Sequence, residues 1–268
     1  IAYRVAEQPQ VRLPVIVNLD GFSLSFTREP VSLPDTDVAA RFLPAFRHDA
    51  GEFRGGHPAS KAVAVIGGGA YSYFRYEAHL ATMAAIDAYN EAAREFEQIF
   101  GRRYQSIECY RNDDAEISFV MIGSFATKAK EAVDRLRDAG HKVGLVRPFM
   151  LRPLPETDLR KALNGKSGIA VIDQNLAPGR GGILHGEVTS VLYGTRKEPA
   201  AVLSYIGGLG GRDIGAEEFF QIAADVRTAI ADGTTPAPRL LYTQGELRDM
   251  RKMQAVAHVE AAGEELAS

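Results

Sequence analysis

Short apolar segments alternate with amphipathic segments between residues 101 and 231, and this alternation constrains the fold more than any other feature of the chain. The apolar segments are nearly continuous runs, which is typical of strands that are buried on both faces. Strands that alternate with helices form a parallel sheet, and the helices cover both of its faces. The sequence therefore predicts an α/β fold with a parallel sheet and helices on both faces. The expected strands are residues 104–110, 117–125, 142–150, 167–175 and 201–208, and the expected helices are residues 128–140, 156–165, 183–194 and 216–230.

The segments that flank this α/β unit are less regular. Asp35 or Thr36 can cap a short helix that ends before Leu43, because both side chains accept hydrogen bonds from backbone amides. Gly101 should end a long helix, since glycine readily adopts the left-handed conformation that follows many helices. The other expected elements are a helix end at 1–7, a strand at 13–22 opened by Pro14, an irregular connection at 48–75, a helix at 77–100 with an apolar face of Leu80, Met83, Ala84, Tyr89 and Phe96, and a polar, helix-prone tail at 239–268.

The composition excludes several classes of protein. Hydrophobic residues make up 46% and charged residues 24% of the 268 residues, which is ordinary for a globular protein and unlike a disordered chain. The net charge of −3 and the pI near 6.1 give no basic footprint for nucleic acid. No apolar run approaches the roughly 18 residues of a membrane span, and the N-terminus lacks the basic start and apolar core of a signal peptide. We therefore expect a cytoplasmic protein.

Cysteine and histidine limit the sites that the chain can form alone. Cys109 is the single cysteine, so this chain by itself makes no disulfide and no four-cysteine zinc or iron–sulfur site. Its only basic neighbour is Arg111, which favours a buried, inert thiol. The six histidines form no HExxH pattern or facial triad, so no metal site is expected. Asp113 and Asp114 lie in an expected turn, where acidic residues usually remain solvated, and no catalytic dyad is evident.

Ser124 precedes one of the expected helices. It lacks the G-x-S-x-G pattern of a nucleophile elbow. The hydroxyl group is therefore expected to cap the helix rather than to act as a nucleophile.

The segment YIGGLGGRDIG at 205–215 raises the question of phosphate binding, because it has four glycines between an expected strand and an expected helix. A dinucleotide fingerprint requires such a turn in the first βα unit, and this turn lies in the last one. A P-loop requires Gly-Lys-Ser/Thr where this chain has Arg212, Asp213 and Ile214. The pattern favours a turn that needs positive φ, with Asp213 capping the next helix, and phosphate binding stays the alternative.

A second glycine-rich turn poses the same question one βα unit earlier. Gly179, Gly181 and Gly182 precede the helix expected at 183–194. Backbone amides at a helix N-terminus can bind an anion, but glycines also permit close packing of a helix on a sheet. His185 is the one histidine beside this turn, and a role on the helix face is favoured for it.

Three segments, read together, resemble one family. They are LPVIVNLDGFSLSFTREPVSLPD at 13–35, FGRRYQSIECYRNDDAEISFVMIGSFATKAKEAVDRLRDAGHKVGLVRPFMLRPLP at 100–155 and YIGGLGGRDI at 205–214. In this order they are similar to the α subunit of 2-oxoacid:ferredoxin oxidoreductases of the pyruvate:ferredoxin oxidoreductase type. The similarity covers about residues 1–230, and the combination is far more specific than any one segment.

The resemblance implies a division of the chain and a set of cofactors. Residues 1–50 are the C-terminal end of a thiamine pyrimidine-binding α/β domain, 51–100 a connecting segment with a long helix, 101–231 a transketolase C-terminal-like domain and 232–268 a C-terminal tail. The assembled enzymes decarboxylate a 2-oxoacid on thiamine diphosphate and Mg, pass electrons through [4Fe–4S] clusters to ferredoxin, and deliver the acyl group to coenzyme A. The clusters belong to partner subunits or domains, and none of these groups is expected to bind this chain alone.

The chain departs from the family pattern in three respects. The N-terminal part that carries the glutamate activating the aminopyrimidine is missing, in agreement with a chain that begins at Ile1 without an initiator Met and is expected to be a fragment or a processed product. The segment NLDGF at 18–22 is not the GDG…NN motif that binds diphosphate and magnesium. Phe26 stands where the family often has histidine, which indicates an altered substrate preference.

The first hypothesis is therefore the C-terminal portion of such an α subunit, inert by itself and active only with β and γ/δ-type subunits, with pyruvate as the first substrate to consider. No catalytic residue is predicted. Two alternatives stay open: a freestanding module that binds a nucleotide or coenzyme A phosphate at 179–182 and 207–211, and a structural subunit that has lost its active-site half. The candidate residues of the cofactor cleft or its loops are Asp20, Gly21, Ser23, Ser25, Gly207, Gly208, Gly210, Gly211, Arg212 and Asp213.

Overall fold

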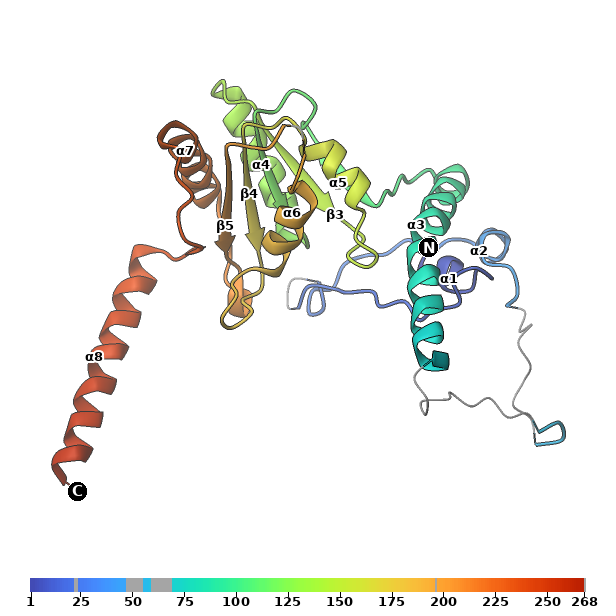
Figure 1. Cartoon of the computed structure of the whole chain (residues 1–268), viewed down its shortest axis with the longest axis horizontal. Coiled ribbons are helices and arrows are strands. Elements are labelled where there is room, and N and C mark those ends of the chain that lie inside the picture. Colours follow the sequence, from blue (N-terminus) through green and yellow to red (C-terminus); the bar gives the residue numbers. More distant parts are fainter. Residues whose placement is uncertain (22–23, 47–54, 59–68, 196, 268) are drawn as a thin grey trace. The chain divides into compact units, whose positions relative to one another are not determined.

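The computed structural model describes residues 1–21, 24–46, 55–58, 69–195 and 197–267 (Figure 1). Its internal contacts divide the chain into two compact units, Ile1–Tyr110 with Val146–Ala162 and Arg111–Leu145 with Leu163–Ser268. The domain boundaries that the resemblance implies remain predictions. The helices are α1 Ala2–Ala6, α2 Thr36–Phe42, α3 Gly69–Phe100, α4 Phe125–Asp138, α5 Glu156–Leu163, α6 Ile183–Leu192, α7 Ala216–Asp232 and α8 Gln244–Ala267, with a short 3₁₀ turn at Leu209–Gly211. The strands are β1 Ile107–Tyr110, β2 Ile117–Met121, β3 Val143–Pro148, β4 Gly168–Asp173, β5 Ala201–Ile206 and β6 Arg239–Leu240.

The strands form one sheet in the order β1-β3-β2-β4-β5-β6. The pairs β2–β4, β4–β5 and β5–β6 are parallel, with Ile117 opposite Gly168 and Gly168 opposite Ala201. Every residue of β2 and β4 is buried, which explains their nearly continuous apolar sequences. The predicted α/β fold with a parallel sheet is confirmed.

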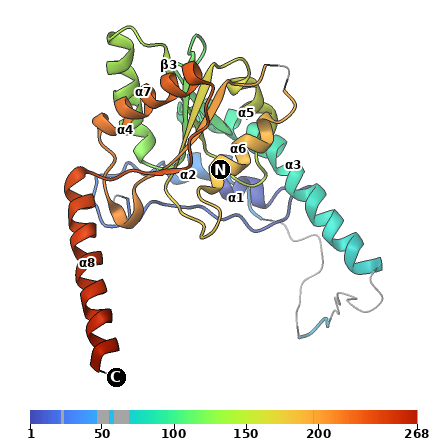
Figure 2. The ribbon, with the colours of Figure 1, turned by 60° about the vertical axis from the view of Figure 1, so that its left-hand side comes forward.

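Helices cover both faces of the sheet in the second unit. Helix α4 contacts α7, α7 also contacts β4 and β5, and α6 contacts β4 and β5. Figure 2 shows α4 and α7 on one side of these strands and α6 on the other. The rings of Phe119 on β2 and Phe219 on α7 are 5.8 Å apart and both are fully buried, so the core lies between the sheet and α7.

The first unit has a smaller, helical core. Val5, Val11, Phe42, Ala88 and Ala92 are buried together and join α1 and α2 to the C-terminal half of α3. The side chain of Asp35 accepts a 2.8 Å hydrogen bond from the amide of Asp37, so the predicted cap of α2 is confirmed. Gly101, with φ of 67°, follows α3 as predicted.

The strand predicted at residues 13–22 is wrong for the residues that the structure describes there. Residues 12–20 have no assigned secondary structure, and Val15, Ile16, Val17 and Leu19 are exposed. A strand requires hydrogen-bonded neighbours, and no described segment pairs with this one. The apolar pattern is that of a doubly buried strand, but the described part of the chain does not cover these side chains.

The long helix differs from the prediction, whereas the helix-prone tail is confirmed by α8. Helix α3 begins at Gly69 rather than Glu77, and residues 69–75 of the predicted connection belong to it, whereas 47–54 and 59–68 lie outside the described residues. Leu80 and Met83 are exposed, because the buried face of α3 is made by Ala88, Ala92 and Ala93. The tail forms β6 and α8. Over the described ranges, no helix is both long and apolar enough to span a bilayer.

Candidate functional site

The glycine-rich turn after β5 adopts the conformation that its glycines predict. Gly208, Gly210 and Gly211 have φ of 76°, 66° and 80°, a region in which side chains with a Cβ are strained. At Gly207 a Cβ would lie 2.8 Å from Leu241 and 2.9 Å from Ile214. The turn therefore needs glycine for positive φ and for close packing, as the sequence favoured.

Arg212, which follows this turn, is fully engaged by protein groups. Its Nε donates to both carboxylate oxygens of Glu246 at 2.7 Å, Nη2 donates to Glu218 at 3.0 Å, and Nη1 donates to the carbonyl of Leu241 at 2.9 Å. Burial opposes its charge, but the hydrogen bonds to Glu246 and Glu218 outweigh burial and raise the pKa of Arg212. Arg212 thus joins the glycine turn to the first turns of α7 and α8, and its guanidinium has no place for a phosphate.

Glu246 completes this cluster from α8. Its carboxylate accepts hydrogen bonds from the amide of Thr243 at 2.7 Å and the hydroxyl of Thr243 at 2.8 Å. These bonds and the one from Arg212 lower the pKa of Glu246 from its ordinary 4.5 to about 2. These hydrogen bonds hold the start of α8 in place. We define Arg212, Glu218, Thr243 and Glu246 as the Arg212 cluster.

The predicted cap of α7 by Asp213 is wrong. Gly215 is the N-cap residue, and its amide donates to Glu218 at 2.9 Å. Asp213 lies two residues earlier, accepts a hydrogen bond from the amide of Ile214, and pairs with Lys128 of α4. Glu217 and Glu218 lie in the first turn of α7, and Glu218 already accepts the hydrogen bond of the N-cap amide, so a protein carboxylate takes the place that a phosphate would need.

The second glycine-rich turn is also closed to an anion. The carboxylate of Asp173, at the end of β4, accepts hydrogen bonds from the amides of Leu184 at 2.8 Å and His185 at 3.1 Å and from the side chain of Asn175 at 3.1 Å. Burial raises the pKa of Asp173, and the three hydrogen bonds offset part of that rise. A Cβ on Gly182 would lie 2.1 Å from Oδ2 of Asp173. A protein carboxylate thus occupies the N-terminus of α6, and the alternative of a nucleotide or coenzyme A phosphate at 179–182 and 207–211 gains no support.

The N-terminal candidates of the cofactor cleft belong to the first unit. Gly21 and Ser25 are exposed and Asp20 is half-buried, while Ser23 lies outside the described residues. Phe26 is 76% exposed. These residues therefore form no enclosed pocket for thiamine diphosphate, and no step of a reaction is assigned to them.

Further predictions concern the single side chains of Cys109, Ser124, Asp113 and Asp114. Cys109 is exposed, so the prediction of a buried thiol is wrong; β1 is the edge strand of the sheet, where fewer residues cover the side chains. Ser124 occupies the N-cap position of α4, but its hydroxyl makes no capping hydrogen bond. Asp113 and Asp114 are exposed as predicted.

Among the described residues, no group of three or more His, Cys, Asp or Glu side chains could hold a metal ion.

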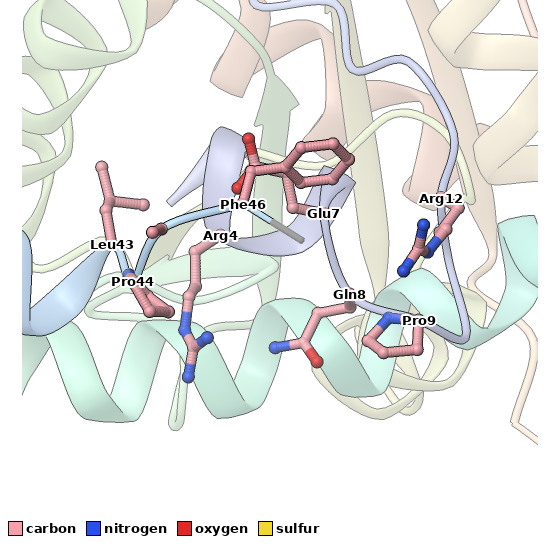
Figure 3. A pocket seen from close by; sticks show the side chains of 9 residues that line it. Arg4, Glu7, Gln8, Pro9, Arg12, Leu43, Pro44 and Phe46 are labelled. Atoms are coloured by element: carbon pink, nitrogen blue, oxygen red, sulfur yellow. The ribbon is translucent and has the colours of Figure 1, made fainter. Parts of the chain in front are cut away.

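The first unit contains a hollow that the sequence did not indicate. It lies beside α1 and has a volume of about 220 Å³. Figure 3 shows Gln8 between Arg4 and Arg12, with Phe46 on the opposite wall. Arg4 is paired with Glu95 at 3.1 Å, and the guanidinium of Arg12 is 5.9 Å from the centre of the Phe46 ring. The polar groups of this hollow therefore serve the packing of the unit.

Comparison with known proteins confirms the resemblance seen in the sequence. Residues 115–219 match the family model for pyruvate:ferredoxin oxidoreductase core domain II. The chain is 34% identical to pyruvate synthase subunit PorA of Pyrococcus abyssi over 238 residues, which are 89% of this chain and 60% of the relative. It is 37% identical to pyruvate synthase subunit PorA of Thermotoga maritima over 224 residues, which are 81% of this chain and 55% of the relative. It is 35% identical to ketoisovalerate oxidoreductase subunit VorA of Pyrococcus horikoshii over 237 residues, 87% of this chain and 58% of the relative. The chain thus spans about three-fifths of the length of the relatives it matches.

Among solved structures, the chain is similar to a 2-oxoglutarate:ferredoxin oxidoreductase from Magnetococcus marinus. The identity is 19% and the TM-score 0.40, over 65% of this chain and 25% of that chain.

Proposed function

We propose that this chain is the C-terminal portion of the α subunit of a thiamine-diphosphate-dependent 2-oxoacid:ferredoxin oxidoreductase. The observation that carries the proposal is its identity of 34–37% with pyruvate synthase subunits over 80–89% of its own length. The assembled enzyme oxidatively decarboxylates a 2-oxoacid, gives the acyl group to coenzyme A and passes electrons to ferredoxin. Pyruvate is the first substrate to test, and the ketoisovalerate relative makes a branched-chain oxoacid the second.

The cofactors of this proposal lie largely outside the chain. Thiamine diphosphate with Mg supplies the carbanion chemistry in the assembled enzyme, and [4Fe–4S] clusters in partner subunits or domains carry the electrons. The described residues form no enclosed cofactor pocket, because Gly21 and Ser25 are exposed and amides at the starts of α6 and α7 already bond to carboxylates. The contribution of the chain is therefore to support the cofactor cleft and to contact β and γ/δ-type subunits in the cytoplasm.

An exposed apolar segment supports this role. Ile16 is 84%, Val31 83% and Leu33 85% exposed, and they lie in a stretch without secondary structure. Contiguous exposed apolar side chains mark surfaces that other protein covers. We define residues 13–21 and 24–35 as the open segment, and we propose that it becomes buried in the assembled enzyme.

Co-expression tests the proposal. The chain should co-purify with the β and γ/δ-type subunits and the missing α-subunit half, and this complex should reduce ferredoxin only when a 2-oxoacid, coenzyme A and thiamine diphosphate are all present. The isolated chain should be inactive. Turnover of a 2-oxoacid by the isolated chain, or a complex that forms without any such activity, would refute the proposal.

A matched pair of variants tests the open segment. Ile16→Asp changes an exposed side chain, so the melting temperature of the isolated chain should stay the same while the yield of complex falls at least tenfold. Tyr193→Asp alters an equally exposed residue after α6, at 87%, and should change neither. Equal yields of complex from both variants would show that the open segment remains exposed in the enzyme.

A further inference from the structure

A second hollow lies at the amino ends of the strands in the second unit, away from the glycine-rich turns. It has a volume of about 310 Å³, which is at the lower end of the ~300–1,000 Å³ of small-molecule sites. We call it the Arg227 hollow. Its walls are Glu116, Ile117, Gly140, His141, Lys142, Val143, Ser167, Arg227 and Ile230.

The floor of the Arg227 hollow is apolar and well ordered by the fold. Ile117 begins β2, Val143 begins β3, and both are buried. Ile230 comes from α7, which approaches β4 closely at Gly168, where a Cβ would meet Ile230 at 2.8 Å. Ile230 is half-buried, so it supplies most of the apolar surface that a small aliphatic group can contact.

The backbone amides around the Arg227 hollow are already used. The amides of Glu116 and Ile117 donate to the carbonyl of Lys142, and those of Ser167 and Gly168 donate to the carbonyl of Glu116. A ligand can therefore be recognised only by side chains. This excludes the backbone cradle that binds a phosphate in nucleotide sites.

The side chains at the rim leave one positive charge uncompensated. Lys142 pairs with Glu116 at 3.3 Å, so these two charges largely cancel. Arg227 is exposed and makes no ion pair with any residue of the described ranges. The hydroxyl of Ser167 and the ring of His141 add hydrogen-bonding groups at the same rim.

We propose that the Arg227 hollow binds a small organic carboxylate with an apolar chain. The planar guanidinium of Arg227 matches a carboxylate, which it can bind through two parallel hydrogen bonds. The apolar floor of Ile117, Val143 and Ile230 then receives the aliphatic group. This site is separate from the proposed oxidoreductase reaction, and it requires no cofactor or partner.

Butyrate is a suitable probe, with phosphate and butylamine as comparison ligands. In the full chain labelled at the δ1 methyl groups of isoleucine, butyrate should shift the Ile117 and Ile230 signals and leave the buried Ile169 and Ile172 of β4 unchanged. For a ligand with six non-hydrogen atoms in an open hollow, we expect a dissociation constant of about 1–10 mM. Phosphate lacks the apolar chain and butylamine lacks the negative charge, so each should bind at least tenfold more weakly.

Variants at exposed arginines decide the outcome. Arg227→Gln should weaken butyrate binding about tenfold, and Arg227→Lys should restore part of it. Arg180→Gln is the matched control, because Arg180 is exposed, lies elsewhere in the same unit and should not affect binding. Unchanged melting temperatures establish that the variants are folded. Absence of saturable shifts below 50 mM, equal binding of phosphate, or identical binding by Arg227→Gln and Arg180→Gln would overturn the proposal.

Discussion

A single methyl group on Gly182 tests the carboxylate cap of α6. A Cβ at this position would lie 2.1 Å from Oδ2 and 2.5 Å from Cγ of Asp173. The backbone of Gly182 has φ of −72° and ψ of 134°, which alanine adopts without strain. Gly182 is the N-cap residue of α6, where alanine is less favourable than glycine by about 0.5–1 kcal/mol, so a larger loss of stability in Gly182→Ala reports the contact with Asp173.

The expected magnitude follows from the bonds that the carboxylate makes. Alanine must displace Asp173, and the amides of Leu184 and His185 then lose a charged acceptor. Each bond of this kind contributes about 1.5–3 kcal/mol. Leu184 is buried and His185 is partly accessible to water, which replaces some of the second bond. We expect the free energy of unfolding to fall by about 3 kcal/mol, and the melting temperature by about 6–12 °C.

Urea denaturation followed by circular dichroism measures this loss. Gly245→Ala is the control, because the nearest atom to a Cβ there is the hydroxyl of Thr243 at 3.8 Å and the residue lies in the first turn of α8. That variant should be as stable as the parent or slightly more so. Asp173→Ala removes the group with which the new methyl collides, so the two substitutions should be strongly non-additive. A loss below 1 kcal/mol in Gly182→Ala, or full additivity with Asp173→Ala, would refute the reasoning.

Three other expectations follow from the ion pairs and the buried tyrosine. In Arg212→Leu the pKa of Glu246, measured by carboxylate NMR, should rise part of the way from about 2 towards 4.5. An unchanged pKa would show that the ion pair between Arg212 and Glu246 is not formed. The hydrogen bond from Arg137 lowers the pKa of Asp114. This pair therefore stabilises the fold above the unfolded pKa of 3.8, and its contribution is lost as the pH falls through the lowered pKa of the folded state. Arg137→Gln should remove that part of the pH dependence of the unfolding free energy. Tyr205 is buried and donates to a carboxylate on α7, so Tyr205→Phe should cost about 1 kcal/mol in urea denaturation, and equal stability would contradict this hydrogen bond.

The α/β unit could be predicted from the sequence because its local and global signals agree. The runs ISFVM in β2 and GIAVID in β4 are mostly apolar, with Ser118 and Asp173 as the polar exceptions, and the sheet buries every one of these residues. Helix α4 has buried residues at 126, 129, 132, 133 and 136, which is the spacing of one helical face. Where one pattern predicts both the type of an element and its burial, the sequence is sufficient to predict that element.

The same reasoning failed where burial depends on other parts of the protein. The sequence VIVNL at 15–19 has the composition of a buried strand, yet a strand forms only beside a hydrogen-bonded neighbour. Cys109 was expected to be buried from its residue type, but its exposure is set by the position of β1 at the edge of the sheet. Sheet order depends on contacts between distant segments, which a local pattern does not contain.

The glycine-rich turn shows the same limit for the candidate site. Four glycines followed by an arginine are compatible with a phosphate site and with a packed turn, because glycine serves both and an arginine can bond to a phosphate or to protein carboxylates. The partners of Arg212 decide between them, and Glu218, Leu241 and Glu246 lie 6, 29 and 34 residues further along the chain. The carboxylate of Glu218 also accepts the N-cap amide of α7, and the carboxylate of Glu246 accepts the amide of Thr243 at the start of α8. The guanidinium of Arg212 bonds to the carboxylates of Glu218 and Glu246, which also hold the first turns of α7 and α8. Release of Arg212 for a ligand would therefore disrupt both helix starts, so the role of the turn is structural.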